Sequence, residues 1–203
     1  MALYRFDDVT RITQQCFKAM LLALARPGTT HPLDEPPGTA FSHLSLPPPL
    51  CAVAHTILDE QVTLAPCSSN AEAWVEELVA STGSRRAPLA EADYVLDTSV
   101  PTLSQIRRIK QGTLLAPEDG AMLLVWSDQR IAGTAGTVRI AGPGIESSVL
   151  CQVSDTLLRL FKRRMAVHFE YPMGFDIFAV SPEGILGIPR TSTLEIPPDA
   201  GGV

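Results

Sequence analysis

Lysine is the scarcest charged residue of this 203-residue chain and occurs only as Lys18, Lys110 and Lys162. A lysine that forms a Schiff base needs a pocket that desolvates its amine and lowers its pKa. All three lysines fall in predicted helices beside other polar side chains. We therefore expect no pyridoxal phosphate (PLP) on this chain.

Metal-ligand spacings are also missing. The cysteines form no CxxC pair, and no two histidines have the HxH or i,i+4 spacing of ligands that share a zinc ion. Single, scattered cysteines are typical of reduced thiols in a cytoplasmic protein. We expect no metal on this chain. The residues concerned are Cys16, Cys51, Cys67, Cys151, His31, His43, His55 and His168.

Long apolar runs and a positive charge excess are absent as well. Runs such as 121–126 are too short to span a bilayer, and Arg5, Asp7 and Asp8 interrupt the start where a signal peptide needs an apolar core. The formal net charge of -6 argues against broad contact with nucleic acid or an anionic membrane. These features predict a cytoplasmic protein. Residues 1–100 carry the whole excess, with 12 acidic and 6 basic side chains, so we expect any anion site in the second half.

The familiar catalytic fingerprints are not met. The chain has no GxSxG elbow of serine hydrolases. The stretch "IAGPGIESS" follows a predicted strand, but it lacks the third glycine of GxGxxG and no GK[ST] follows. Gly142 and Gly144 therefore belong either to a plain turn or to a tentative phosphate-binding loop.

What is present is an alternation of helical and strand patterns. A stripe of apolar residues predicts a first helix that ends at Pro27-Gly28, and "FDIFAV" and "GILGI" predict a final antiparallel hairpin. The pattern predicts one α/β domain over residues 1–203, with a mixed sheet flanked by helices and a disordered tail at 197–203. The stripe consists of Val9, Ile12, Cys16, Phe17, Met20 and Leu24, and we expect Phe17 and Met20 in the core.

A basic helix is predicted between Ser154 and Arg164. Its apolar side chains, Leu157, Leu158, Phe161 and Met165, share one face. Arg159, Lys162 and Arg163 take the opposite face, which is either a solvated surface or a contact surface for an acidic partner or a polyphosphate.

The segment "IPRTST" near the end places Arg190 directly after a proline that interrupts strand pairing. A chain that leaves the sheet there aims Arg190 at a loop, a carboxylate or a phosphate. Structural anchoring is the favoured interpretation, and ligand binding with Thr191 and Asp176 is the alternative.

Four segments together resemble the PhnH family, the H subunits of the bacterial carbon–phosphorus (C–P) lyase core complex. They are "FKAMLLALARPG", "PEDGAMLLV", "GPGI", and "YPMGFDIF" leading into "IPRTST". The resemblance covers about residues 6–196. Leu24 and Ser192 replace the Met and Thr that are frequent in the family, and both replacements keep the character of the site.

The resemblance implies a role in phosphonate degradation within a cytoplasmic assembly of several subunits. That assembly joins a phosphonate to the ribose of ATP, which gives ribose 1-phosphonate 5-triphosphate and frees adenine, and a radical-SAM subunit then breaks the C–P bond. The resemblance also implies a homodimer when the subunit is alone, and a fold similar to the large domain of PLP-dependent transferases without the cofactor lysine.

Three functions stay open at this point. The chain is an auxiliary subunit of that complex, or a stand-alone enzyme that binds a phosphorylated nucleotide through Arg190 and the Gly142–Gly144 loop, or a degenerate PLP-fold interaction module. The tentative ligand residues are Gly142, Gly144, Asp176, Arg190 and Thr191, and the ligand expected is a phosphonate or a derivative of ATP.

Overall fold

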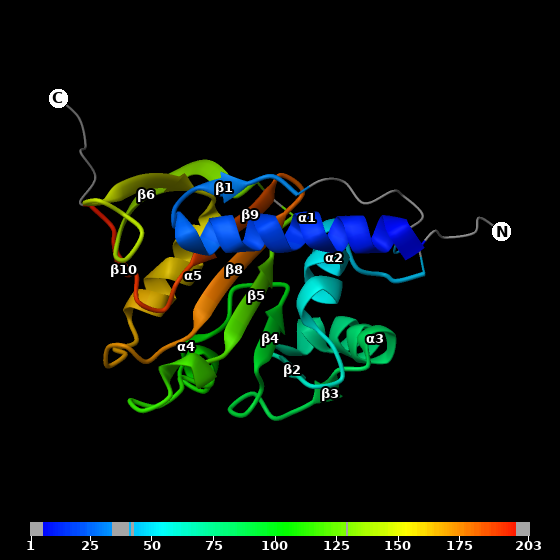
Figure 1. Ribbon diagram of the computed structural model, residues 1–203. Coiled ribbons are helices and arrows are strands. Elements are labelled where there is room, and N and C mark those ends of the chain that lie inside the picture. The colour runs from blue at the N-terminus through cyan, green and yellow to red at the C-terminus, as the bar shows by residue number, and fades with distance from the viewer. Residues whose placement is uncertain (1–5, 34–40, 42, 129, 198–203) are drawn as a thin grey trace.

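A computed structural model describes residues 6–33, 41, 43–128 and 130–197 (Figure 1). Almost all of the expected tail, from residue 198 on, lies outside the described residues. The elements run in the order α1 (Phe6–Ala25), β1 (Thr30–His31), α2 (Pro48–Ile57), β2 (Thr63–Pro66), η1 (Ser69–Ala71), α3 (Glu72–Thr82), β3 (Arg85–Arg86), β4 (Tyr94–Asp97), α4 (Leu103–Ile106), η2 (Pro117–Asp119), β5 (Met122–Trp126), β6 (Ala132–Ala141), β7 (Val149–Val153), α5 (Asp155–Met165), β8 (Asp176–Ser181), β9 (Gly184–Ile188) and β10 (Thr193–Glu195).

The larger sheet is mixed, as the sequence predicts. Its seven strands lie in the order β1-β9-β8-β5-β4-β2-β3. The strands from β3 to β8 are parallel, and β9 and β1 are antiparallel to their neighbours. The predicted hairpin is confirmed as β8 and β9, joined through a turn that ends at Gly184. This hairpin is not the last β-structure of the chain, because β10 follows it.

A second, three-stranded antiparallel sheet has the order β10-β6-β7. The sequence predicts only part of β6 as a strand and does not predict β7. Figure 1 shows this sheet at one end of the larger one, beside the C-terminal end of α1. The side chains of Ile140 and Val149 approach the chain at Gly28, just after α1.

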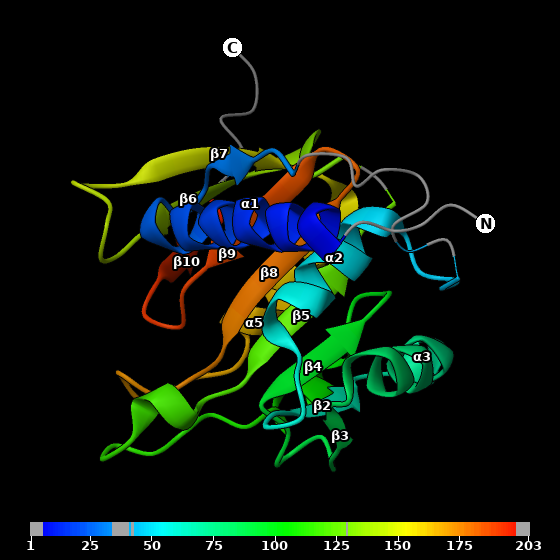
Figure 2. The ribbon, with the colours of Figure 1, turned by 45° about the vertical axis from the view of Figure 1, so that its right-hand side comes forward.

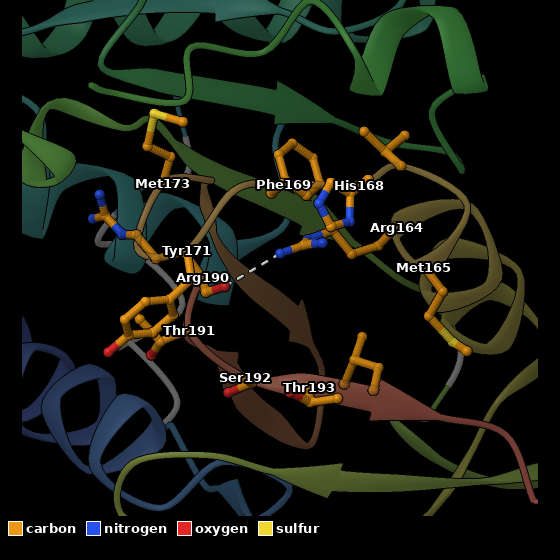
Figure 3. Close-up of a pocket in the computed structure, with 12 residues that line it drawn as sticks. Arg164, Met165, His168, Phe169, Tyr171, Met173, Arg190, Thr191, Ser192 and Thr193 are labelled. Carbon is orange, nitrogen blue, oxygen red and sulfur yellow. Dashed lines mark hydrogen bonds between the residues drawn. The ribbon is translucent and has the colours of Figure 1, made fainter. Parts of the chain in front are cut away.

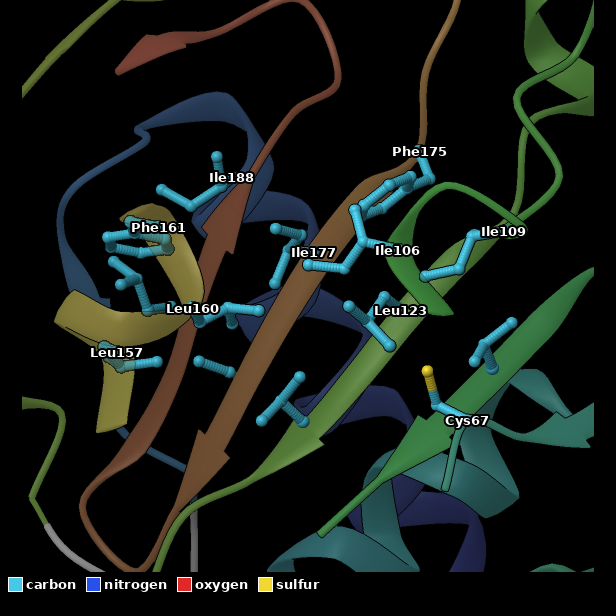
Figure 4. Packing of buried hydrophobic residues seen from close by; sticks show 14 of the residues in the cluster. Cys67, Ile106, Ile109, Leu123, Leu157, Leu160, Phe161, Phe175, Ile177 and Ile188 are labelled. Atoms are coloured by element: carbon cyan, nitrogen blue, oxygen red, sulfur yellow. The ribbon is translucent and has the colours of Figure 1, made fainter. Parts of the chain in front are cut away.

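The larger sheet separates two apolar cores. Successive side chains of a strand point to opposite faces, so Ile177 and Ala179 join one core while Phe178 and Val180 join the other. Figure 2 shows α1, α2 and α3 in front of the sheet and α5 behind it. Figure 4 shows Phe161 of α5 and its apolar neighbours packed in the core on the face of the sheet that α5 covers.

The first helix is confirmed, but its buried stripe differs from the predicted one. The side chain of Phe17 is 52% exposed, whereas Met20 is buried as expected. The stripe that packs on the sheet and α2 is Ile12, Cys16, Ala19, Met20 and Ala23. The prediction favours the large aromatic ring, whereas small alanines hold the packed positions, and Gly187 of β9 lies so close to α1 that a Cβ there would come within 2.7 Å of the backbone of Ala23.

No helix among the residues that the structure describes combines the length and the apolar character that a bilayer crossing requires.

Candidate functional site

A cleft opens between the C-terminal end of α5 and the segment that joins β9 to β10 (Figure 3). Its volume is about 460 Å³. The walls combine two arginines and three consecutive hydroxyl side chains with aromatic and aliphatic groups. They are Arg164, Met165, Val167, His168, Phe169, Tyr171, Met173, Arg190, Thr191, Ser192, Thr193 and Leu194.

Arg190 is held on one side of this cleft by Asp176, the first residue of β8. Nη2 of Arg190 lies 2.6 Å from Oδ2 of Asp176, and its Nε donates to Oδ1 at 3.3 Å. The backbone N–H of Arg190 also donates to Oδ1, at 2.7 Å. Both side chains are largely buried, with 16% and 13% exposed. Their charges are therefore balanced within the fold.

The remaining donor group of Arg190 is occupied as well. Nη1 donates to the backbone carbonyl of Pro117 in η2. Gly120 makes room for this contact, because a Cβ there would overlap the carbonyl oxygen of Gly174 and lie 2.8 Å from Nη1 of Arg190. Figure 3 shows the guanidinium of Arg190 pointing away from Arg164. The geometry agrees with the favoured interpretation of Arg190 as a structural anchor.

Arg164, in the last turn of α5, has a different environment. Its guanidinium lies over the ring of Phe169, 4.0 Å from the centroid, and Nη2 donates to the backbone carbonyl of Arg190 at 3.2 Å. Within the described residues it forms no ion pair with a carboxylate. Burial lowers the pKa of Arg164 to about 10, and the charge of Asp176 opposes that shift. The side chain remains a cation at neutral pH.

Three hydroxyls line the same cleft. Within the part of the chain that the structure describes, the side chains of Thr191, Ser192 and Thr193 make no hydrogen bond, and the Oγ of Ser192 is buried. Buried hydroxyls usually have a hydrogen-bond partner. Thr191 and Thr193 therefore offer the cleft unused hydroxyl groups, whereas the Oγ of Ser192 is enclosed by the protein.

The predicted ligand residues are only partly brought together. Asp176, Arg190 and Thr191 line a second, smaller cavity together, whereas Asp176 does not line the cleft itself. Gly142, with a φ of 145°, lies in the turn after β6, where a Cβ would come within 3.1 Å of the Cα of Ser192. Gly144 faces the backbone of Ala25 at the end of α1 instead. Neither glycine lines the cleft.

The predicted contact surface on α5 requires one correction. Arg163 does not point away from the fold, because its Nη1 donates to the carbonyls of Val100 (2.7 Å) and Pro101 (2.5 Å). Arg159 and Lys162 are exposed, and Arg159 pairs with Asp155 one turn earlier at 3.0 Å. Met165, predicted on the buried face, is 40% exposed because the helix ends there.

Sequence reasoning did not single out Arg164, although a signal was available. At ~100° per residue, Arg164 lies about 20° from Leu157 around the helix, next to the apolar face. Its position predicts a partly buried cation, unlike that of Arg159 or Lys162. His168 and Phe169 carry no comparable signal, since they follow the helix in an irregular segment.

Other reactive groups lie elsewhere. Burial raises the pKa of the Cys16 thiol to about 11 and that of the Cys51 thiol to about 12. Within the residues described, no three His, Cys, Asp or Glu side chains gather as ligands for a metal ion would. The chemistry of the described cleft is thus that of arginine, hydroxyl and histidine groups.

The fold and the cleft define a mixed α/β protein with a cationic, hydroxyl-lined cleft at its C-terminal segment. Comparison with known proteins gives the family. The family model described as bacterial phosphonate metabolism protein (PhnH) matches residues 4–195, and the chain belongs to this family. It is also 26% identical over 185 residues to the putative C-P lyase subunit protein HtxG of Stutzerimonas stutzeri, a match that covers 90% of this chain and 86% of that protein.

These similarities confirm the resemblance seen in the four sequence segments and place the chain in phosphonate metabolism.

Proposed function

We propose that this chain is a subunit of a C–P lyase complex and helps to form ribose 1-phosphonate 5-triphosphate from ATP and a phosphonate. The observation that carries the proposal is the family match over residues 4–195, together with a relative that is named as a putative C-P lyase subunit. The other subunits of such a complex are its expected partners, and the cytoplasm is its expected location.

Reconstitution tests this function directly. The remaining subunits are mixed with ATP and methylphosphonate, with and without this chain, and the release of adenine is measured. We expect adenine release to depend on this chain. An equal rate without it would contradict the proposal, and release by this chain alone would favour a stand-alone nucleotide-binding enzyme.

The alternative of a stand-alone enzyme requires nucleotide binding through Arg190 and the Gly142–Gly144 loop. Arg190 already has a carboxylate and a carbonyl partner, and the loop does not line the cleft. This arrangement favours the subunit over the enzyme. The third alternative, a degenerate PLP-fold interaction module, predicts partner binding without any ligand in the cleft.

We further propose that the chain binds no PLP, in keeping with a fold similar to PLP-dependent transferases that has lost the cofactor lysine. Lys18 and Lys162 are exposed, and the Nζ of Lys110 forms an ion pair with Asp93 at 2.8 Å. None has the apolar pocket that activates a Schiff-base lysine. A yellow preparation whose absorbance is lost on replacing one of these lysines by alanine would contradict this.

We expect the isolated chain to be a homodimer, and sedimentation equilibrium would give its molar mass in solution. Within the complex, the exposed pair Arg159 and Lys162 is the proposed partner-contact surface. Charged groups at the rim of an interface mainly set its association rate and salt dependence. The double variant Arg159→Glu/Lys162→Glu should therefore co-purify less with the other subunits, most clearly at low salt, where exposed charges are least screened. Normal assembly of the double variant at every salt concentration would show that Arg159 and Lys162 face solvent and do not contact a partner.

A further inference from the structure

Arg164 is the candidate ligand residue of the cleft, because it forms no ion pair with a carboxylate among the described residues. The other arginine of the cleft, Arg190, is paired with Asp176, whereas Arg164 has no carboxylate partner within the described residues. A partly buried cation is unfavourable unless an opposite charge or strong hydrogen bonds compensate it. An anion in the cleft would supply that compensation.

The guanidinium of Arg164 is also held in place for such a partner. One face lies on the ring of Phe169, and one N–H group is used by the carbonyl of Arg190. Guanidinium carries five N–H donors in a planar fork, so the others remain for a ligand. This fork matches the spacing of two oxygens of a phosphoryl or phosphonate group.

The opposite side of the cleft provides neutral donors. Figure 3 shows Ser192 and Thr193 across the cavity from Arg164, and His168 beside it. The hydroxyls of Thr191, Ser192 and Thr193 are free of hydrogen bonds to the described residues. Each hydroxyl can donate one hydrogen bond to a phosphate oxygen, so the two sides of the cleft can hold one anionic group between them.

The cleft also has an apolar part. Met165, Val167, Phe169 and Leu194 contribute to its walls. The volume of about 460 Å³ lies in the range of roughly 300–1,000 Å³ that small-molecule sites occupy. These walls fit a ligand in which the anionic group is attached to an organic part.

We infer that Arg164, with the hydroxyls of Thr191 and Thr193, binds the anionic group of an organic phosphate or phosphonate in this cleft. The inference deepens the proposed function, on which it rests for the identity of the ligand, and it assigns the binding role to Arg164 in place of Arg190.

Calorimetric titration of the isolated, full-length chain tests this assignment. The probes are ATP, methylphosphonate and inorganic phosphate. We expect ATP or methylphosphonate to bind more tightly than inorganic phosphate, and Arg164→Leu to weaken that binding by about 10-fold or more, the usual effect of losing a charge-assisted hydrogen bond. Arg159→Leu, on the same helix but paired with Asp155, is the matched control and should bind like the unmodified chain.

A second variant keeps the test decisive if Arg164→Leu does not fold. Thr193→Val has nearly the same shape and removes only the hydroxyl, and we expect a loss of about 3-fold or more. Unchanged binding by a folded Arg164→Leu protein, or no binding of any probe by the unmodified chain, would overturn the inference. Equal affinity for all three probes would overturn the assignment of an organic ligand.

Assembly provides the independent readout. Arg164→Leu should still co-purify with the other subunits, because Arg164 lies inside the cleft and not on the exposed surface of α5. Loss of binding with normal assembly supports the inference. Failure of the unmodified chain to assemble would instead contradict the proposed function, whatever the titration shows.

Discussion

Arg190 and Arg164 lie on two sides of one cleft, and the fold treats their charges differently. Arg190 has a carboxylate, a carbonyl and a backbone contact that fix it, whereas Arg164 has an aromatic ring and one carbonyl. The first arrangement joins β8, η2 and the segment after β9. The second leaves a cation facing a cavity. The comparison separates an arginine that stabilises the fold from one that is available to a ligand.

The largest effect is expected when the balanced side is broken. Asp176→Ala leaves Arg190 unpaired in a largely buried site, which typically costs about 3–5 kcal/mol in the free energy of unfolding. Urea denaturation measures it. Asp155→Ala, which removes the exposed partner of Arg159 and an acidic group from the first turn of α5, is the control and should cost ~1 kcal/mol or less. Equal effects of the two would mean that the Arg190–Asp176 pair does not anchor the fold.

A smaller effect should follow from Arg163→Glu. The change removes a charge-assisted donor from the carbonyls of Val100 and Pro101, so we expect a loss of about 1–3 kcal/mol in urea denaturation. Lys162→Glu on the neighbouring exposed position should cost less than ~1 kcal/mol, mainly through the helix dipole. If both variants were equally stable, Arg163 would belong with the solvated residues after all.

Arg164→Leu should change the free energy of unfolding less than Asp176→Ala or Arg163→Glu. It loses a cation–π contact, worth about 0.5–2 kcal/mol, but it also removes the unfavourable burial of an unpaired charge. We expect a net change below ~1 kcal/mol in thermal unfolding. Arg190→Leu, which strands Asp176, is the comparison and should be clearly more harmful. A large loss in Arg164→Leu would assign Arg164 a structural role like that of Arg190.

The smallest effect concerns the half-exposed pair of Lys110 and Asp93. Burial alone would raise the pKa of Asp93, but hydrogen bonds from Lys110 and Thr63 lower it below its ordinary value of 3.8. A lowered pKa in the folded state gives stability that is present above the ordinary pKa and lost as the pH falls through the folded value.

Lys110→Met should therefore reduce stability at neutral pH and flatten its decline below about pH 4. The change should stay under ~1 kcal/mol, because solvent screens a pair that is 29% and 39% exposed. Acid titration of unfolding, followed by circular dichroism, measures it. An unchanged acid profile would show that the Lys110–Asp93 pair contributes nothing to folding.

Much of the fold was predictable because its signals are local. Apolar strand runs and helical periodicity give the order of elements, and the turn between β8 and β9 is encoded by "SPEG". The predictions were wrong where the burial or pairing of a residue depends on which distant element packs against it. Phe17 is exposed because Ala19 and Ala23 take the packed positions, and β7, which the sequence does not predict, is a strand that pairs with β6.

The sequence by itself determined the α/β class, the acidic balance and, through four ordered segments, the family. Only the tertiary structure decided which arginine is compensated. Asp176 lies 14 positions before Arg190, and Pro117 lies 73 positions before it, so no local pattern predicts their meeting. Likewise, no local pattern predicts that Arg164 has no carboxylate within ion-pair distance among the described residues. Electrostatic pairing depends on distances of a few ångströms in space, and these are set by how the strands and helices pack.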